Sequence, residues 1–157
     1  MTLSESPAFL KKFRKTPWKF QQTFITPHRN LQHFVAEVVS ACLPCRSGCL
    51  TLDQVILEPT NLISLFNSYS NPPQYGHGWS ITAEEKHEIE AVLYAAFRDT
   101  VDFIFVPKPT PFAIFADHDE FTTFYAHTRS NLNRVAEALT RGGFETVPGY
   151  QRSQPRR

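Results

Sequence analysis

The stretch that most constrains the fold runs from Val101 to Phe144. Its first half holds two short runs of apolar, aromatic and β-branched residues, Val101–Val106 and Phe112–Ala116, separated by three prolines. Runs of this length and composition are typical of strands, and proline belongs in the connection because it cannot donate a backbone hydrogen bond. Phe121–Ala126 has the aromatic and threonine content of a third strand. We therefore expect antiparallel strands, with Asp117–Glu120 as a hairpin turn.

The second half of the stretch predicts an amphipathic helix. Leu132, Val135, Ala136 and Leu139 lie at the spacing of one helical face. Thr128 or Ser130 is expected to cap its start. Gly142 and Gly143 are expected to end it, because glycine adopts a left-handed conformation without steric cost. Phe144–Val147 is read as a return strand that extends the sheet.

Two further helices are predicted nearer the start of the chain. The apolar spacing of Asn30–Leu43 indicates one of them, and the second begins at Thr82, where Glu85 completes a capping-box pattern. A shorter helix is expected from Thr60, and Leu50–Leu57 is read as a strand. The predicted fold class is α+β, a single domain in which about three helices pack on a small antiparallel sheet of about four to five strands.

The charge is distributed unevenly over the 157 residues, although the formal net charge is only +1. The first 20 residues carry five cations against one acid, and residues 150–157 carry three arginines, so the remainder is acidic. We divide the chain into a basic aromatic arm (1–20), a globular domain (21–150) and a basic tail (151–157). Any contact with a nucleic acid or an anionic surface is expected at these termini.

The arm interleaves bulky apolar residues with cations. Its candidate binding residues are the aromatic Phe9, Phe13 and Trp18 and the basic Lys11, Lys12, Arg14 and Lys15. One interpretation is a short basic helix docked on the domain by its aromatic residues. The alternatives are binding to a nucleic acid or to an anionic membrane surface, for which so few charges make a small footprint.

The segment from Asn67 to Trp79 reads as the longest loop. It contains two prolines and two glycines, and its candidate binding residues are Tyr75, His77 and Trp79. Long loops inside small domains often carry function, so a ligand pocket or partner surface is one interpretation. The other is a surface loop anchored by its aromatic residues.

Cys42, Cys45 and Cys49 are spaced as C-x2-C-x3-C. Closely spaced thiolates suit a zinc ion with His33 or His28 as a further ligand, or an iron–sulfur cluster. A tetrahedral site commonly shows two separated pairs of ligands, and Cys42 lies on an apolar helical stripe. We therefore predict reduced structural cysteines, with no metal and no cofactor.

Asp117, His118 and Asp119 form the best candidate catalytic site. Two carboxylates two residues apart at a strand end are suited to Mg²⁺ or Mn²⁺, and His118 or His127 is available as a base. Acidic residues are also what a hairpin turn requires, so a plain turn is the favoured interpretation and the site is the alternative. Nucleotide-binding glycine motifs, H-E-x-x-H and G-x-S-x-G are absent from the sequence.

The leading functional hypothesis is a non-enzymatic module that binds another protein, as a subunit, accessory factor or inhibitor. It relies on the missing catalytic motifs, on 14 phenylalanines and on the cationic arm. The alternative is a Mg²⁺- or Mn²⁺-dependent enzyme that acts on a phosphate-containing substrate through the acidic turn. With no apolar run long enough for a signal peptide or a membrane span, we expect a cytoplasmic protein.

Overall fold

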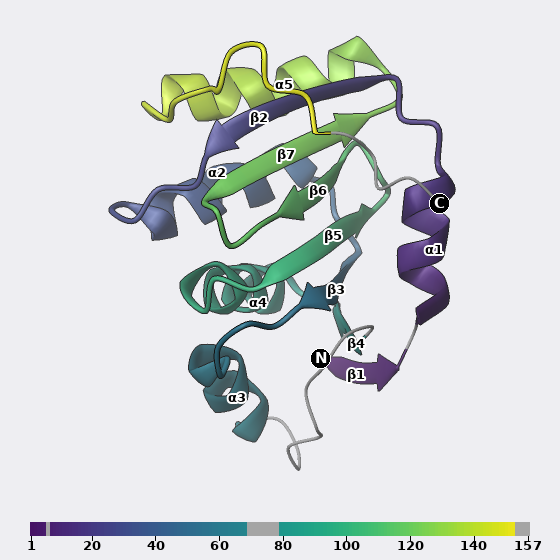
Figure 1. The fold of residues 1–157 in the computed structure, drawn as a ribbon, viewed down its shortest axis with the longest axis vertical. Helices are drawn as coiled ribbons and strands as arrows, with labels where there is room; N and C mark the ends of the chain where they lie inside the picture. The colour runs from purple at the N-terminus through teal and green to yellow at the C-terminus, as the bar shows by residue number, and fades with distance from the viewer. Residues whose placement is uncertain (6, 69–78, 153–157) are drawn as a thin grey trace.

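In the computed structural model, residues 1–5, 7–68 and 79–152 are described. Seven strands form one antiparallel sheet in the order β1-β4-β3-β5-β6-β7-β2 (Figure 1). The strands are β1 (Thr2–Glu5), β2 (Phe20–Ile25), β3 (Ser47–Gln54), β4 (Trp79–Ala83), β5 (Asp102–Lys108), β6 (Ala113–Ala116) and β7 (Phe121–Ala126). The helices are α1 (Pro7–Lys15), α2 (Leu31–Cys42), α3 (Thr60–Asn67), α4 (Lys86–Arg98) and α5 (Arg129–Arg141).

The predicted class, a single α+β domain with an antiparallel sheet, is confirmed, but the predicted numbers of strands and helices are too low. The structure has seven strands and five helices in its described residues. The hairpin turn at Asp117–Glu120 is confirmed, because β6 pairs with β7 in the register Ala116↔Thr122. Phe144–Val147 is not a full strand and makes a single bridge, between Phe24 and Thr146.

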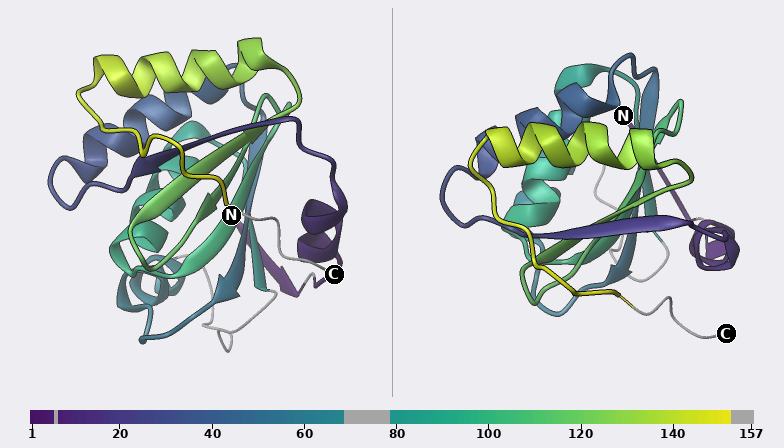
Figure 2. Two further views of the ribbon diagram at one scale, coloured as in Figure 1. Left: turned by 45° about the horizontal axis from the view of Figure 1, so that its top comes forward. Right: turned by 90° about the horizontal axis from the view of Figure 1, so that it is seen from above.

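Two faces of the sheet are covered by different helices. Helices α2, α4 and α5 lie on one side, which we call the helix face, and α1 lies on the other, which we call the α1 face (Figure 2). Because side chains alternate along a strand, Phe103 and Phe105 point into the helix-face core, whereas Ile104 points toward α1. This alternation explains why the central strands are apolar at nearly every position.

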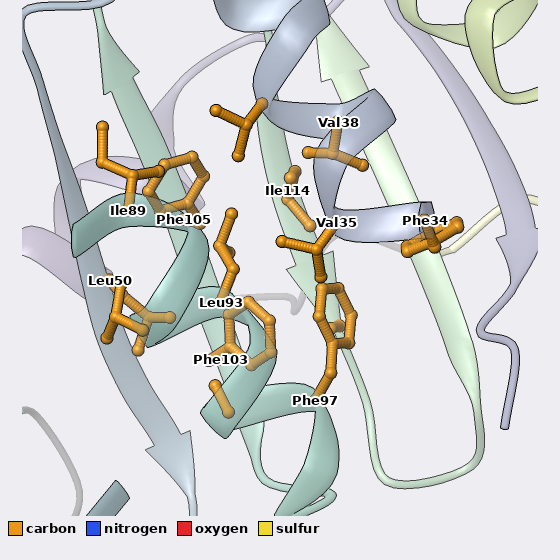
Figure 3. Close-up of a cluster of buried hydrophobic side chains, with 14 of the residues drawn as sticks. Phe34, Val35, Val38, Leu50, Ile89, Leu93, Phe97, Phe103, Phe105 and Ile114 are labelled. Carbon is orange, nitrogen blue, oxygen red and sulfur yellow. The ribbon is translucent and has the colours of Figure 1, made fainter. Parts of the chain in front are cut away.

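The helix-face core is a continuous aromatic and aliphatic cluster (Figure 3). Phe97 meets both Phe34 and Phe103 edge to face, with ring centroids 5.6 and 5.0 Å apart. This geometry is the preferred one for aromatic pairs. The surplus of phenylalanine is therefore largely used in the core.

Helix α4 begins later than the sequence indicates. Thr82 is not a helix cap, because it lies in β4 opposite Cys49 and Thr2, and the helix begins after Glu85. The carboxylate of Glu88 accepts a hydrogen bond from the backbone N–H of Glu84. That bond is the main reason that the pKa of Glu88 lies below its usual value.

The predicted end of α5 is confirmed. The helix stops at Arg141, and Gly143 adopts a φ of 85°. At its start, the Thr128 hydroxyl accepts a hydrogen bond from the Asn131 N–H at 3.2 Å. None of the helices in the described part of the chain combines the length and apolar character needed to cross a bilayer.

Candidate functional site

Three loops meet at one end of the sheet: the β2–α2, α4–β5 and β6–β7 connections. The N–H of Thr26 in the first donates to the carbonyl of Glu120 in the third, at 2.7 Å. All the non-glycine residues of the described chain that have a positive φ lie in these loops: Asn30 (61°), Thr100 (50°) and Glu120 (71°). A left-handed conformation is uncommon for a β-branched residue such as threonine and is typical of functional sites.

A small cavity of about 60 Å³ lies between the same loops. Its apolar wall includes Leu31 and Phe97, and its polar rim includes Arg98 and Glu120. The His28 ring pairs with Glu120 across its edge, with 2.6 Å between Nε2 and Oε1. The cavity has the volume of a few water molecules, so this end of the sheet has little room for an enclosed substrate.

The predicted catalytic residues lie in the β6–β7 turn beside this cavity. The Asp117 carboxylate accepts a hydrogen bond from the Phe121 N–H at 3.0 Å and is also engaged by the guanidinium group of Arg152. The Asp119 side chain, in contrast, is 78% exposed and lies 3.7 Å from Nε2 of His118. The two aspartates therefore have different partners.

His118 is held by a residue of the neighbouring strand. Its Nδ1 lies 2.7 Å from Oδ1 of Asp102, and the same oxygen accepts the His118 backbone N–H at 2.8 Å. The hydrogen bond with this mostly buried carboxylate is the main reason that the pKa of His118 is raised above its ordinary value. The arrangement fixes the imidazole and favours its protonated form.

A group of three or more side chains arranged to hold a metal ion is absent from residues 1–5, 7–68 and 79–152. The described part of the turn is therefore not a preformed metal site, and the metal-dependent enzyme hypothesis stays a prediction. A cation bound by both Asp117 and Asp119 requires Arg152 to leave first.

The three cysteines lie in different surroundings, and each is a free thiol. Cys42 is buried on α2, Cys45 donates a hydrogen bond to the Ser47 carbonyl at 3.1 Å, and Cys49 lies on β3 near the hydroxyl of Thr51. Burial is the main cause of the raised pKa of both Cys42 and Cys49. These two thiols are held in the protonated form, which is neither nucleophilic nor a metal ligand.

The aromatic residues of the N-terminal arm pack on the protein's own sheet. Phe13 is 7% exposed and meets Tyr125 edge to face, and Trp18 stacks on His127 with ring centroids 4.5 Å apart. Phe9 is half-buried against the same cluster. Phe13 is therefore not a free anchor for a partner, because its ring already fills the space between α1 and β7.

The cations of the arm differ in their contacts: one is paired within the domain and three are exposed. Arg14 bonds Asp53 on β3, with 2.7 Å between Nη2 and Oδ1. Lys11, Lys12 and Lys15 are exposed and line a shallow hollow along α1. Helix α1 therefore has an exposed basic surface, which Lys11, Lys12 and Lys15 form.

The predicted loop site is only partly visible. Tyr75 and His77 lie outside the described residues. Trp79 is half-buried in β4 and packs against the helix-face core.

Sequence reasoning missed two residues of this end of the sheet, Asp102 and Arg152. A charged residue at the start of the apolar strand Val101–Val106 is a signal that could have drawn attention to Asp102. Arg152 carried no such signal, because it lies in a polar segment that reads as a frayed tail. Comparisons with protein-family models, with curated proteins and with solved structures find no match for this chain.

Proposed function

We propose that this protein is a non-enzymatic protein-binding module, a subunit, accessory or inhibitor-type domain, whose helix α1 contacts an acidic protein partner. The observation that carries the proposal is the division of α1 into two faces. Leu10 and Phe13 are buried against the sheet, whereas Lys11, Lys12 and Lys15 face outward. A rigid helix that presents its cations loses less side-chain and backbone freedom on binding than a disordered basic arm.

The position of α1 supports this role. Strands β1 and β2, which flank α1 in the sequence, lie at opposite edges of the sheet, so the connection that contains α1 has to cross the α1 face. The Arg14–Asp53 pair fixes the helix to β3. The lysines are thus carried by a helix that lies on the side of the sheet opposite α2, α4 and α5 (Figure 2).

A protein is favoured over a nucleic acid as the partner because the cationic surface is small. Outside the two termini the chain carries a net negative charge, which opposes an extended polyanion but not a compact acidic patch. Exposed ion pairs contribute about 0.2–1 kcal/mol each, so three of them change an affinity roughly tenfold. The contact is expected to weaken as the salt concentration rises.

The test is site-specific crosslinking combined with charge removal. A photo-crosslinking amino acid at Ala8, which is exposed beside the α1 lysines, is expected to capture a protein through its acidic segment. Replacing Lys11, Lys12 and Lys15 with glutamine should lower the yield about tenfold. The matched control replaces three exposed arginines of α5 with glutamine: Arg129, Arg134 and Arg141.

Two outcomes contradict the proposal. One is an equal loss of crosslinking in the α1 and α5 variants, which indicates a general charge effect. The other is crosslinking at Ala8 to nucleic acid, which supports the alternative partner of the basic arm.

The Mg²⁺- or Mn²⁺-dependent enzyme remains the alternative function. The observation in its favour is His118, which is oriented by Asp102 and keeps its Nε2 near Asp119. A Mg²⁺ titration followed by NMR should shift the Asp117 and Asp119 signals together if both carboxylates bind the ion. Shifts at neither residue at millimolar Mg²⁺ contradict this alternative.

A further inference from the structure

The last described residues of the chain cross from one face of the sheet to the other. Residues 144–152, which we call the C-terminal strap, leave α5 on the helix face and pass the β2 edge to the α1 face (Figure 2). Along that edge, the N–H of Ile25 donates to the Glu145 carbonyl and the N–H of Val147 donates to the Thr23 carbonyl, both at 2.9 Å. The strap thus starts with a short backbone pairing along β2 and then continues onto the α1 face.

Arg152, at the end of the strap, is held in a different way, by side chains. The Arg152 N–H donates to Oε1 of Gln21 at 2.9 Å, and Nε2 of Gln21 donates to the Arg152 carbonyl at 3.3 Å. One carboxamide therefore contacts both backbone groups of a single residue. A glutamine used in this way recognises a peptide main chain without reading its sequence.

The guanidinium group of Arg152 fills a socket made by Phe115 on β6, Thr123 on β7 and Asp117 in the turn between these strands. Its Cζ lies 4.3 Å from the centre of the Phe115 ring, its Nε donates to the Thr123 hydroxyl at 3.4 Å, and its Nη2 bonds the Asp117 carboxylate. Asp117 and Phe115 expose only 9% and 7%, respectively. A carboxylate, an aromatic face and a hydroxyl together match the charge, the flat surface and the donors of guanidinium.

We propose that this socket, formed by Gln21, Phe115, Asp117 and Thr123, is a recognition site for an arginine in an extended peptide of a partner protein, and that Arg152 occupies it as an internal ligand. The site differs from the α1 lysines in sign, since it offers a carboxylate to a cationic peptide. The strap is joined to the domain, so Arg152 competes at an effective concentration in the millimolar range. A partner's arginine enters when its peptide outcompetes the strap or when the strap is displaced.

Phe144 anchors the start of the strap, with its ring centroid 5.0 Å from that of Phe34. The end of the strap is suited to displacement because, beyond the short backbone pairing with β2, Arg152 is its main anchor. Tyr150 adds one ring contact, with Phe121, at 5.1 Å between centroids. A partner peptide that pairs with the same β2 edge reproduces these contacts by strand addition. The recognised class of ligand is therefore an extended segment with an arginine that reaches the socket.

The experiment uses the full chain with Arg152→Ala, which empties the socket, and the capped tetrapeptide Gly-Tyr-Gln-Arg as the probe. We expect saturable NMR shifts at Gln21 and Thr123 with a dissociation constant on the order of 1 mM, and binding to the wild-type chain at least about fivefold weaker. The same peptide ending in lysine should bind several-fold more weakly, because an ammonium group lacks the planar fork.

Three control substitutions separate recognition from general charge. Asp117→Asn in the Arg152→Ala chain should abolish binding, whereas Asp119→Asn, which alters an exposed carboxylate of the same turn, should leave it unchanged. Arg129→Ala removes another arginine that lies over a ring, 4.7 Å from the centre of Phe20, and should not create a binding site.

The proposal is overturned if the Arg152→Ala chain shows no saturable binding at 10 times the expected constant, roughly 10 mM. Equal binding by the lysine peptide, or binding that survives Asp117→Asn, also overturns it. If Arg152→Ala does not fold, Arg152→Gln is titrated in its place, since glutamine keeps much of the aliphatic side chain but offers Asp117 no positive charge. Absence of binding there has the same meaning.

Discussion

The start of helix α3 is capped by a residue from another helix, and this feature yields a quantitative prediction. Pro59, which precedes α3, makes no side-chain cap. Instead, Oδ1 of Asp99 accepts hydrogen bonds from the N–H and Nδ2 of Asn61, at 2.9 and 2.7 Å, and its Oδ2 accepts the Leu62 N–H at 2.7 Å. Asp99 is 7% exposed and follows the last residue of α4. It therefore joins the end of one helix to the start of the other.

Replacing Asp99 with alanine should lower the free energy of unfolding by about 3 kcal/mol. Loss of a helix cap costs about 1 kcal/mol. The Leu62 N–H is then buried without its partner, which costs roughly 1–3 kcal/mol more, whereas the exposed Asn61 can bond water. Asparagine keeps one acceptor oxygen, but its NH2 group replaces the second and cannot accept a hydrogen bond. The loss of unfolding free energy in Asp99→Asn should therefore be roughly half of that in Asp99→Ala.

Urea denaturation at pH 7, followed by circular dichroism, measures this change. The midpoint should fall while the slope stays constant, because the change in exposed surface on unfolding is nearly the same. For a chain of this size, a loss of 3 kcal/mol lowers the melting temperature by roughly 6–12 °C. Hydrogen exchange should accelerate first in α3.

Asp119→Ala is the control, since its side chain is 78% exposed and lies in the β6–β7 turn. It should change the stability by less than about 0.5 kcal/mol. If Asp99→Ala falls within the same limit, the capping argument is refuted. Water would then have to reach the amide of Leu62.

Two further predictions concern the core and the acidic turn. Gly48→Ala should destabilise the fold by about 1–3 kcal/mol, measured as a lower urea midpoint, because the new Cβ meets two atoms of the buried Phe105 ring at 2.4 and 2.5 Å; an unchanged midpoint contradicts it. The raised pKa of His118 means that its ion pair with Asp102 stabilises the fold fully below the ordinary pKa and loses this contribution as the pH rises through the raised value. An NMR titration should show the pKa of His118 fall in Asp102→Asn, and an unchanged value argues against the pair.

The strands with strong local patterns could be predicted from the sequence. Strand β7 and its turn agree with prediction. Strand β5 starts one residue later than predicted and continues to Lys108, so the expectation that Pro107 lies in the connection is wrong, because it pairs with Gly48. Strands β1, β2 and β4 were missed because they are short and rich in polar residues. Their polar side chains pair across the sheet: the Thr23 hydroxyl bonds that of Thr123 at 2.8 Å, and Thr51 bonds Ser80 at 2.7 Å.

Only those parts of the candidate site whose residues are adjacent in the chain could be predicted from the sequence. The acidic turn is visible because its residues are adjacent in the chain. Asp102 is 16 residues away from His118, and Arg152 is 35 residues away from Asp117. Contacts at such separations depend on strand order and on the path of the strap, which a pattern of hydrophobic residues does not contain.

The strand order also determines when the sheet can be completed during synthesis. Among the described strands β2 pairs with β7, and its other edge meets residues that come later still, so Phe20 must wait for Ala126. Strand β1, at the opposite edge of the sheet, must wait for β4. At about 5–20 residues per second, the ribosome needs roughly 5–20 s to supply those partners to β2. During that interval β2 has no neighbouring strand, and the buried face of α1 lacks its contacts with Phe115 and Tyr125. The nascent chain is therefore expected to fold late, after β7 has emerged, and to be a substrate for chaperones until then.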